Sequence, residues 1–339
     1  MQYKLNIGKL MAGDIILVGY NDPDSRKIQR RTESDYSHAM LYWRGSVLHV
    51  SDIVITSNPS RMLFDEDESV CILRLKDEYR TALRIKHLID YARKFVGTFY
   101  DRRALVALRD GKKVEPKENR QMCARYVAQC FDYVCLDLVE DYELCTPEDI
   151  YKSDIVYSVE NPLLEATPED IAFKNSFDVT EHQFDAIKGF LISLKRKYPQ
   201  EDIVSLEQLE EFIKKNPENG DTALELLKKT EYFDLWSLER ENGQYLYNVD
   251  EFKKMWKDEK SAIHQALAII DDSKEIIEEK QGDIQEYQRR RIEIADIEYY
   301  RQMIELREHI IETAKERINV AEQVLADYRI VKIKMPWVS

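Results

Sequence analysis

Short hydrophobic runs separated by turn residues fill the first part of the chain, a pattern typical of an antiparallel sheet. Four runs rich in β-branched and aromatic residues predict strands, at Asp14–Tyr20, His38–Trp43, Ser46–Ser51 and Ser69–Leu75. Two amphipathic helices are expected to follow, because apolar residues recur at steps of three and four over 82–96 and over 122–134. Gly97 is expected to end the first helix, and Asn119 to cap the second. The pattern predicts an α+β domain over residues 1–157.

Helical periodicity dominates the rest of the chain. Pro162 and Pro168 indicate a linker, and short amphipathic helices are expected at 184–197, 206–215 and 222–229. Residues 158–258 are therefore predicted to be a small helical region.

Residues 259–339 carry a heptad repeat. One series is Ile263, Ile270, Ile277 and Ile284, and a second is Ile297, Ile304, Ile311, Ile318 and Leu325. The two series are one residue out of register, which predicts a break near Gly282–Arg291. Either an antiparallel helical hairpin or a coiled coil with a discontinuity fits, and a homodimer through these helices is a further interpretation. The alternation over Arg329–Trp337 suggests a short terminal strand.

Charge and composition narrow the class of protein. Residues 1–157 hold 24 basic and 25 acidic side chains and the remainder 26 and 39, so the net charge of -14 lies almost wholly in the helical part. This acidity argues against nucleic acid as a partner. There is no apolar run long enough for a transmembrane segment and no secretory signal pattern, so a cytoplasmic location is expected. The five cysteines contain no C-x-x-C pair, and we expect no metal and no cofactor.

The segment Ser37–Asp52 (SHAMLYWRGSVLHVSD) contains the first candidate for chemistry. Two alternating runs flank Arg44–Gly45, which reads as a two-residue hairpin turn. In that register His49 lies opposite Met40, so His38 and His49 share one face of the sheet as diagonal neighbours. Either histidine alone is more often structural, but two on one face of an apolar hairpin point to a proton-transfer site.

Cys123 lies in the first turn of the second predicted helix. The helix dipole there favours an anion and lowers the pKa of a thiol. A thiolate beside an imidazole is sufficient for covalent acyl transfer, with His38 as base and His49 as the group that orients it. The alternative is a buried structural cysteine, because Cys130 recurs one heptad later on the same apolar stripe.

The order of these motifs resembles the circularly permuted papain-like, NlpC-type cysteine hydrolases. The resemblance covers about residues 10–157 and is closest to the YiiX/YebB-like branch and the relatives of lecithin retinol acyltransferase. It rests on Gly13-Asp14-Ile15-Ile16, Tyr36-Ser37-His38-Ala39, Val47-Leu48-His49, Gly97-Thr98-Phe99-Tyr100-Asp101, Cys123 and Cys145-Thr-Pro-Glu-Asp-Ile150. It implies a permuted papain-like domain, an antiparallel sheet plus helices, ahead of the helical, partly coiled-coil C-terminal region.

The resemblance also implies roles for individual residues. Cys123 matches the nucleophile, His38 the base and His49 the third polar residue, and Tyr100 falls where its hydroxyl could assist the oxyanion. Many bacterial relatives have serine directly after the nucleophile, whereas this chain has Ala124, which removes a guide to substrate preference.

The segment 21–35 precedes His38 and carries four basic residues. It reads either as a solvated loop or as a basic lip that selects an anionic substrate.

These observations predict a cysteine hydrolase or acyltransferase that acts on an amide, peptide or ester bond. Its substrate is expected to be a small-molecule, peptide or lipid acyl compound. The alternative is an inactive papain-like interaction module in which the helical region binds the partner.

Overall fold

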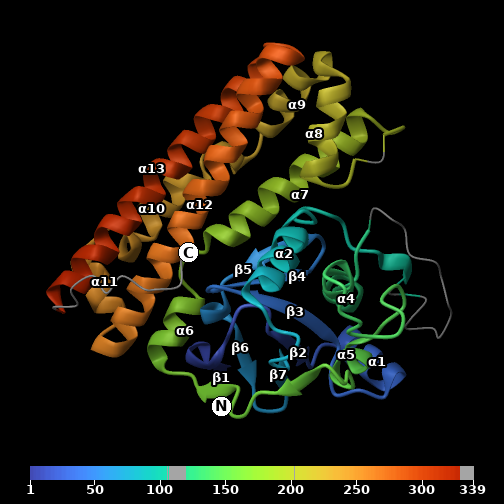
Figure 1. Ribbon diagram of the computed structural model, residues 1–339, viewed down its shortest axis with the longest axis vertical. Helices are drawn as coiled ribbons and strands as arrows, with labels where there is room; N and C mark the ends of the chain where they lie inside the picture. Colours follow the sequence, from blue (N-terminus) through green and yellow to red (C-terminus); the bar gives the residue numbers. More distant parts are fainter. Residues whose placement is uncertain (105, 107–119, 202, 329–339) are drawn as a thin grey trace. The chain divides into compact units, whose positions relative to one another are not determined.

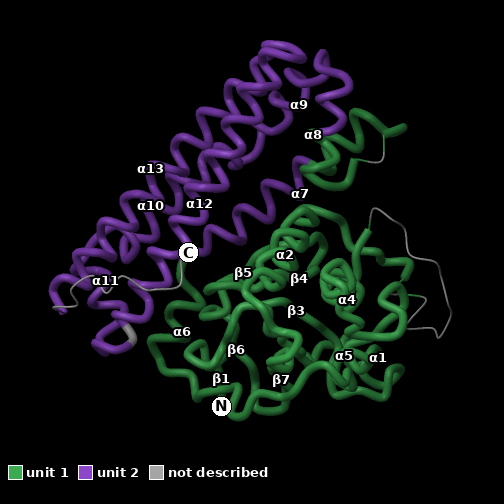
Figure 2. Tube along the Cα trace, viewed as in Figure 1, with its two compact units in different colours: residues 1–176, 191–210 green, residues 177–190, 211–339 purple. Residues whose placement is uncertain are grey.

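The computed structural model describes residues 1–104, 106, 120–201 and 203–328. The chain forms two compact units, one of residues 1–176 and 191–210 and the other of residues 177–190 and 211–339 (Figure 2). Two helices, α7 (Val179–Lys197) and α8 (Leu206–Lys215), are divided between the units. The expected cap Asn119 and the expected terminal strand Arg329–Trp337 lie outside the described residues.

The first unit is α+β and contains two antiparallel sheets (Figure 1). The larger has the order β5-β4-β3-β2-β7-β8 and the smaller β6-β1-β9. The strands are β1 (Gln2–Leu5), β2 (Ile15–Gly19), β3 (His38–Trp43), β4 (Ser46–Val50), β5 (Val54–Ser57), β6 (Leu63–Asp65), β7 (Ser69–Leu75), β8 (Val156–Ser158) and β9 (Leu163–Glu165). The four strands expected from the sequence are confirmed as β2, β3, β4 and β7. The unit extends past residue 157 because β9 pairs with β1.

The larger sheet is covered on both faces, and alternate residues of its central strands serve the two faces. Ile15 and Leu17 of β2 belong to the core formed with helices α2 (Ala82–Arg93) and α4 (Cys123–Tyr133). Ile16 and Val18 belong instead to the core formed with β1 and β6 of the smaller sheet. Both faces are therefore apolar at the middle of β2.

The described part of this unit also contains the helices α1 (Pro23–Thr32), α5 (Pro147–Tyr151) and α6 (Pro168–Lys174). Where the sequence left a loop or basic lip open, the structure has the helix α1. The carboxylate of Asp22 caps it by accepting from the amides of Asp24 and Ser25, and Pro23 is its first residue. Only Ser25 and Ile28 of this helix are buried, so hydrophobic periodicity gave no signal.

The second unit is helical. Besides its parts of α7 and α8 it contains α9 (Gly220–Leu227), α10 (Leu235–Asn242), α11 (Val249–Met255), α12 (Glu259–Glu293) and α13 (Glu298–Asp327). Helices α12 and α13 form an antiparallel hairpin, since Ala262 near the start of α12 shares a core cluster with Val324 near the end of α13 (Figure 1).

The expected break at Gly282–Arg291 is wrong. Helix α12 runs through this segment to Glu293, and the chain turns at residues 294–297. Gly282 lies within the continuous helix, and a Cβ added there would meet open space, so no close packing requires a glycine at this position. The one-residue shift in heptad register is absorbed at the turn between the two helices.

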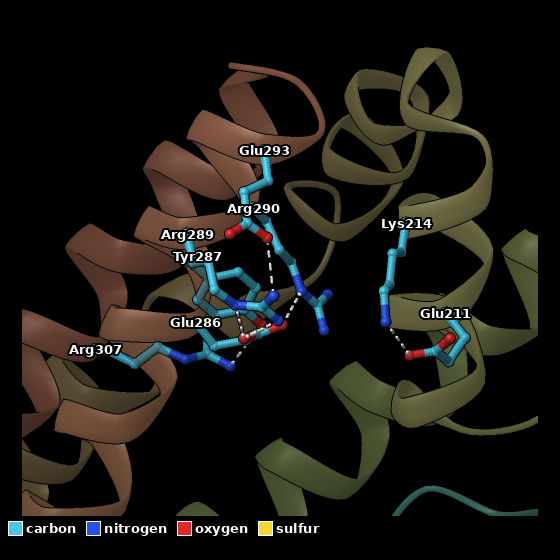
Figure 3. A network of polar contacts seen from close by, with 8 residues as sticks. All are labelled: Glu211, Lys214, Glu286, Tyr287, Arg289, Arg290, Glu293 and Arg307. Carbon is cyan, nitrogen blue, oxygen red and sulfur yellow. Dashed lines mark hydrogen bonds and ion pairs between the residues drawn. The ribbon is translucent and has the colours of Figure 1, made fainter.

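Charged side chains of the helical hairpin form ion pairs with one another (Figure 3). Arg307 of α13 is buried, lies 3.4 Å from the carboxylate of Asp283, and stacks over the ring of Tyr287 at 5.3 Å. On the surface of α12, Arg289 pairs with Glu286 and with Glu293. Among the described helices, none is both long and apolar enough to cross a membrane.

Candidate active site

Two histidines meet on the β3–β4 hairpin as the sequence predicted. Met40 pairs with His49, and both Arg44 and Gly45 at the turn have positive φ, 39° and 82°. These angles are those of a type I′ turn, which matches the twist of a hairpin and sets this register. His38 Nε2 and His49 Nδ1 are 3.2 Å apart, within hydrogen-bond distance.

Ser57 extends this pair to a third side chain. It is the last residue of β5, the strand next to β4, and its Oγ lies 2.9 Å from His49 Nε2. The relay Ser57–His49–His38 thus runs across three neighbouring strands and uses both nitrogens of His49. Neither of these two contacts uses the Nδ1 atom of His38.

Both imidazoles are held in the neutral form. Burial lowers the pKa of His38 from 6.5 to about 4. Burial, with a smaller contribution from His38, lowers the pKa of His49 to about 3. Two adjacent rings that share a desolvated site cannot both be charged, so the relay is uncharged at neutral pH.

Cys123 is the first residue of α4, as the sequence suggested, and it is buried. Its thiol is 3.9 Å from the carbonyl oxygen of Ser37, the residue that precedes His38. The backbone of Ala39, which follows His38, also hydrogen-bonds the sulfur. The thiol therefore lies against the first residues of β3, on both sides of the predicted base.

Tyr100 is brought to the thiol by the backbone. It forms an isolated parallel bridge with Gln121, two residues before Cys123, and its hydroxyl hydrogen-bonds the sulfur. Burial, followed by the nearby Cys123, raises the pKa of Tyr100 well above its usual value. The phenol is consequently a neutral hydrogen-bond donor.

The helix N-terminus does not produce a thiolate at rest. Burial raises the pKa of the Cys123 thiol, although backbone hydrogen bonds and the hydroxyl of Tyr100 act in the opposite direction. The expectation of a lowered pKa is therefore wrong, because desolvation outweighs the helix terminus. At rest the site contains a neutral thiol and neutral imidazoles.

The four residues named from the sequence thus form two pairs, His38 with His49 and Cys123 with Tyr100. Both pairs reach the start of β3. Tyr20 is close to a member of each pair. Its ring centroid is 6.1 Å from that of His38. Burial is the main cause that raises the pKa of Tyr20 to about 12, and the nearby Cys123 contributes to the same rise.

Tyr20 and Ser57 are the residues that sequence reasoning missed. Tyr20 directly follows β2, whose last pairs place Val18 opposite His38, so its position could have been found from the strand register. Ser57 required recognition of β5, a short strand with only two apolar residues, Val54 and Ile55.

All five cysteines are free thiols, and Cys130 is fully buried in the core beneath the larger sheet. Within the part of the chain that the structure describes, no group of three or more His, Cys, Asp or Glu side chains is arranged to hold a metal ion.

Comparisons with known proteins give little beyond the geometry. No protein-family model matches the chain. No curated protein matches it either. Among solved structures, the chain is weakly similar to the crystal structure of the metalloprotein YiiX from Escherichia coli O157:H7, with 16% sequence identity and a TM-score of 0.36. The match covers 44% of this chain and 96% of that one.

Proposed function

We propose that the chain is a cysteine-dependent hydrolase or acyltransferase with a permuted papain-like catalytic domain, acting on an amide, peptide or ester bond. The observation that carries the proposal is the placement of the Cys123 thiol on the backbone that flanks His38, whose ring is oriented by His49. A nucleophile, a base and an orienting group are the three parts that covalent acyl transfer requires.

The two hydrogen bonds of the Ser57–His49–His38 relay determine which imidazole nitrogen can accept the thiol proton. With Nε2–H of His38 donating to Nδ1 of His49, and Nε2–H of His49 donating to Ser57, the Nδ1 lone pair of His38 is free to accept a proton. The thiol proton passes to this nitrogen as the sulfur attacks the carbonyl carbon. The imidazolium then protonates the leaving amine or alcohol as its bond to the acyl carbon breaks. Water or a second acceptor releases the acyl group from sulfur.

The neutral resting state shapes this mechanism. A thiol with a raised pKa and an imidazole with a pKa near 4 do not form an ion pair before substrate arrives. Proton transfer is therefore coupled to attack, and the phenol of Tyr100 is available to donate to the developing oxyanion.

The test is covalent labelling by a broad acyl-donor probe. The wild-type chain should form a thioester at Cys123, identified by mass spectrometry of the peptide, and Cys123→Ala should abolish it. Cys130→Ala is the matched control, because Cys130 lies on the same helix but is fully buried in the core. Labelling that persists in Cys123→Ala, or that is absent from the wild type with every acyl chemistry tried, would contradict the proposal.

The raised thiol pKa also favours a second candidate, an interaction module in which the site is inactive. In that case Cys123 is a buried core residue that donates to the Ser37 carbonyl. Alkylation by iodoacetamide distinguishes the two readings, because an enzyme site must expose its sulfur. Cys123 that reacts no faster than Cys130 at high pH would favour the interaction module.

A further inference from the structure

A compact basic face lies on helix α1, beside the candidate site. Arg26, Lys27, Arg30 and Arg31 are all exposed, whereas Ser25 and Ile28 on the other side of the helix are buried. Steps of four relate position 26 to 30 and position 27 to 31, and a step of three relates 27 to 30, so these positions are neighbours on the helix surface. The four cations therefore form one cluster rather than a scatter along the segment.

Three of the four cations on this face have no ion pair within the described residues, although the segment 21–35 also carries four acidic residues. Lys27 pairs with Asp24, and the carboxylate of Asp22 is occupied as the helix cap. Within the described residues no ion pair connects Arg26, Arg30 or Arg31 to a carboxylate, and Arg30 donates only to the backbone carbonyl of Arg26. Like charges at positions i and i+4, as at 26 and 30 or 27 and 31, destabilise a helix. An anionic ligand would relieve that repulsion.

The topology holds α1 at the catalytic end of the sheet. The helix is the connection between β2 and β3, and Val18 pairs with His38 at the point where the chain leaves for α1 and returns. Tyr20 before the helix contacts the His38 ring, and Ser37 after it contacts the Cys123 thiol. Both ends of the α1 segment are therefore residues of the site.

A close contact fixes the helix against this end. The side-chain amide of Gln29 in α1 donates to the carbonyl oxygen of Asp35 at 3.0 Å. A Cβ at Gly19, the last residue of β2, would meet that same oxygen at 1.9 Å and the Gln29 amide nitrogen at 2.5 Å. Gly19 thus leaves room for the Asp35 backbone and the Gln29 side chain beside the strand end.

We propose that the basic face of α1 recognises a carboxylate or phosphate group on the acyl substrate of Cys123, so that the substrate class is anionic. This inference rests on the proposed acyl-transfer function and adds the charge of the substrate to it. The overall charge of the chain is -14, so a local basic face is needed to attract an anion to this end of the molecule.

Two alkylating probes of nearly equal size measure this effect at the sulfur. Iodoacetate carries a negative charge and iodoacetamide carries none. The ratio of their rates at Cys123 is read from the masses of the peptide at pH 8.5 and low ionic strength, and is divided by the same ratio for the urea-unfolded chain. Low ionic strength lengthens the screening distance to roughly 30 Å at 0.01 M.

The double variant Arg26→Gln/Arg30→Gln should lower this normalised ratio roughly threefold, and the difference should vanish in high salt. Glutamine keeps helix propensity and removes a repulsive pair, so the fold is retained. The control Lys94→Gln/Lys174→Gln removes two exposed cations from the ends of α2 and α6 and should leave the ratio at the wild-type value.

An unchanged ratio in Arg26→Gln/Arg30→Gln would overturn the proposal. So would a variant that loses sedimentation with vesicles of phosphatidylglycerol and phosphatidylcholine while keeping the ratio, because the basic face would then serve a membrane surface. Failure of the proposed function shows differently, as absence of thioester formation with acyl probes of either charge.

Discussion

The β3–β4 hairpin and the α12–α13 hairpin both bury polar side chains, but in opposite charge states. In the β hairpin, His38 and His49 are neutral and contact each other and a serine hydroxyl. In the helical hairpin, Arg307 keeps its charge beside Asp283 and the ring of Tyr287. Neutral groups can pass a proton along a relay, whereas a fixed ion pair resists any change of protonation. Under the proposed function, proton transfer belongs to the first hairpin, whereas the fixed charges of the second serve packing.

The largest expected effect is a loss of folding stability when an ion pair of the helical unit is broken. Arg317 of α13 forms an ion pair with Glu239 of α10 and donates to the Tyr247 hydroxyl at 2.9 Å. Glu239→Gln should lower the free energy of unfolding by about 2–3 kcal/mol, because it leaves a guanidinium that is only 14% exposed without its carboxylate. Hydrogen exchange should accelerate in α13 and stay unchanged in β3 and β4.

The double variant Glu239→Leu/Arg317→Met is the control, since it removes both charges and should recover most of the loss. Thioester formation at Cys123 should remain at the wild-type level in both variants. Loss of labelling in either would show that charge in the helical unit matters to the chemistry, against the division drawn here.

The next effect is a dependence of stability on pH that belongs to the β hairpin. Both imidazoles have a folded-state pKa below 6.5, so the unfolded chain binds more protons as the pH falls. Their stabilising contribution is complete above pH 6.5 and is lost as the pH falls toward 4 and then 3. Urea unfolding at pH 6.5 and 5.5 should differ by about 2 kcal/mol more in the wild type than in His38→Gln/His49→Gln, about 1 kcal/mol for each imidazole. Equal differences would mean that the imidazoles titrate normally.

A smaller effect is expected at the end of the relay. Ser57→Ala removes the acceptor for His49 Nε2–H and should lower kcat/KM roughly 3- to 10-fold, through kcat rather than KM, because the serine orients the base without touching substrate. Ser57→Thr should restore the rate, as it keeps the hydroxyl. Thr56→Ala on the same strand, one residue away and therefore on the other face, is the matched control. Equal losses in Ser57→Ala and Thr56→Ala would point to strand packing instead.

The smallest effect tests the surface of the helical hairpin. Arg289 and Glu293 form an exposed pair at 2.9 Å one turn apart on α12 (Figure 3). Glu293→Gln should leave the free energy of unfolding almost unchanged, since exposed pairs on a helix contribute little and Glu286 still binds Arg289. A chemical-denaturation curve shifted as far as that of Glu239→Gln would contradict the distinction between buried and exposed charge.

The sequence predicted those parts of the fold that depend on local pattern. The β3–β4 register followed from strict alternation and from Arg44–Gly45, a dipeptide suited to a two-residue turn. Helix α1 was missed because its buried side holds only Ser25 and Ile28, too few for a periodic signal. The turn between α12 and α13 was misplaced because a heptad count locates a shift of register but not the residues that absorb it.

The candidate site, like the fold, was predicted only where it depends on local sequence pattern. His38 and His49 could be paired by arithmetic along one hairpin, but the contact of Ser57 with His49 depends on a third strand. The charge state of Cys123 could not be read from its place in the helix, because burial by distant parts of the chain outweighs the helix terminus. Local position predicted which groups are present, and tertiary packing set their pKa values.

The stem of the α1 segment has a consequence for how such a protein changes over time. The Ser37 amide donates to the Val18 carbonyl at 2.9 Å, so a backbone hydrogen bond closes the two strands where the chain leaves for the helix and returns. A closed stem lets the intervening residues be lengthened, shortened or recharged while the sheet and its histidines keep their register. Related chains can therefore differ in substrate preference by substitutions within the 10 residues of α1, while the histidines of the sheet stay unchanged.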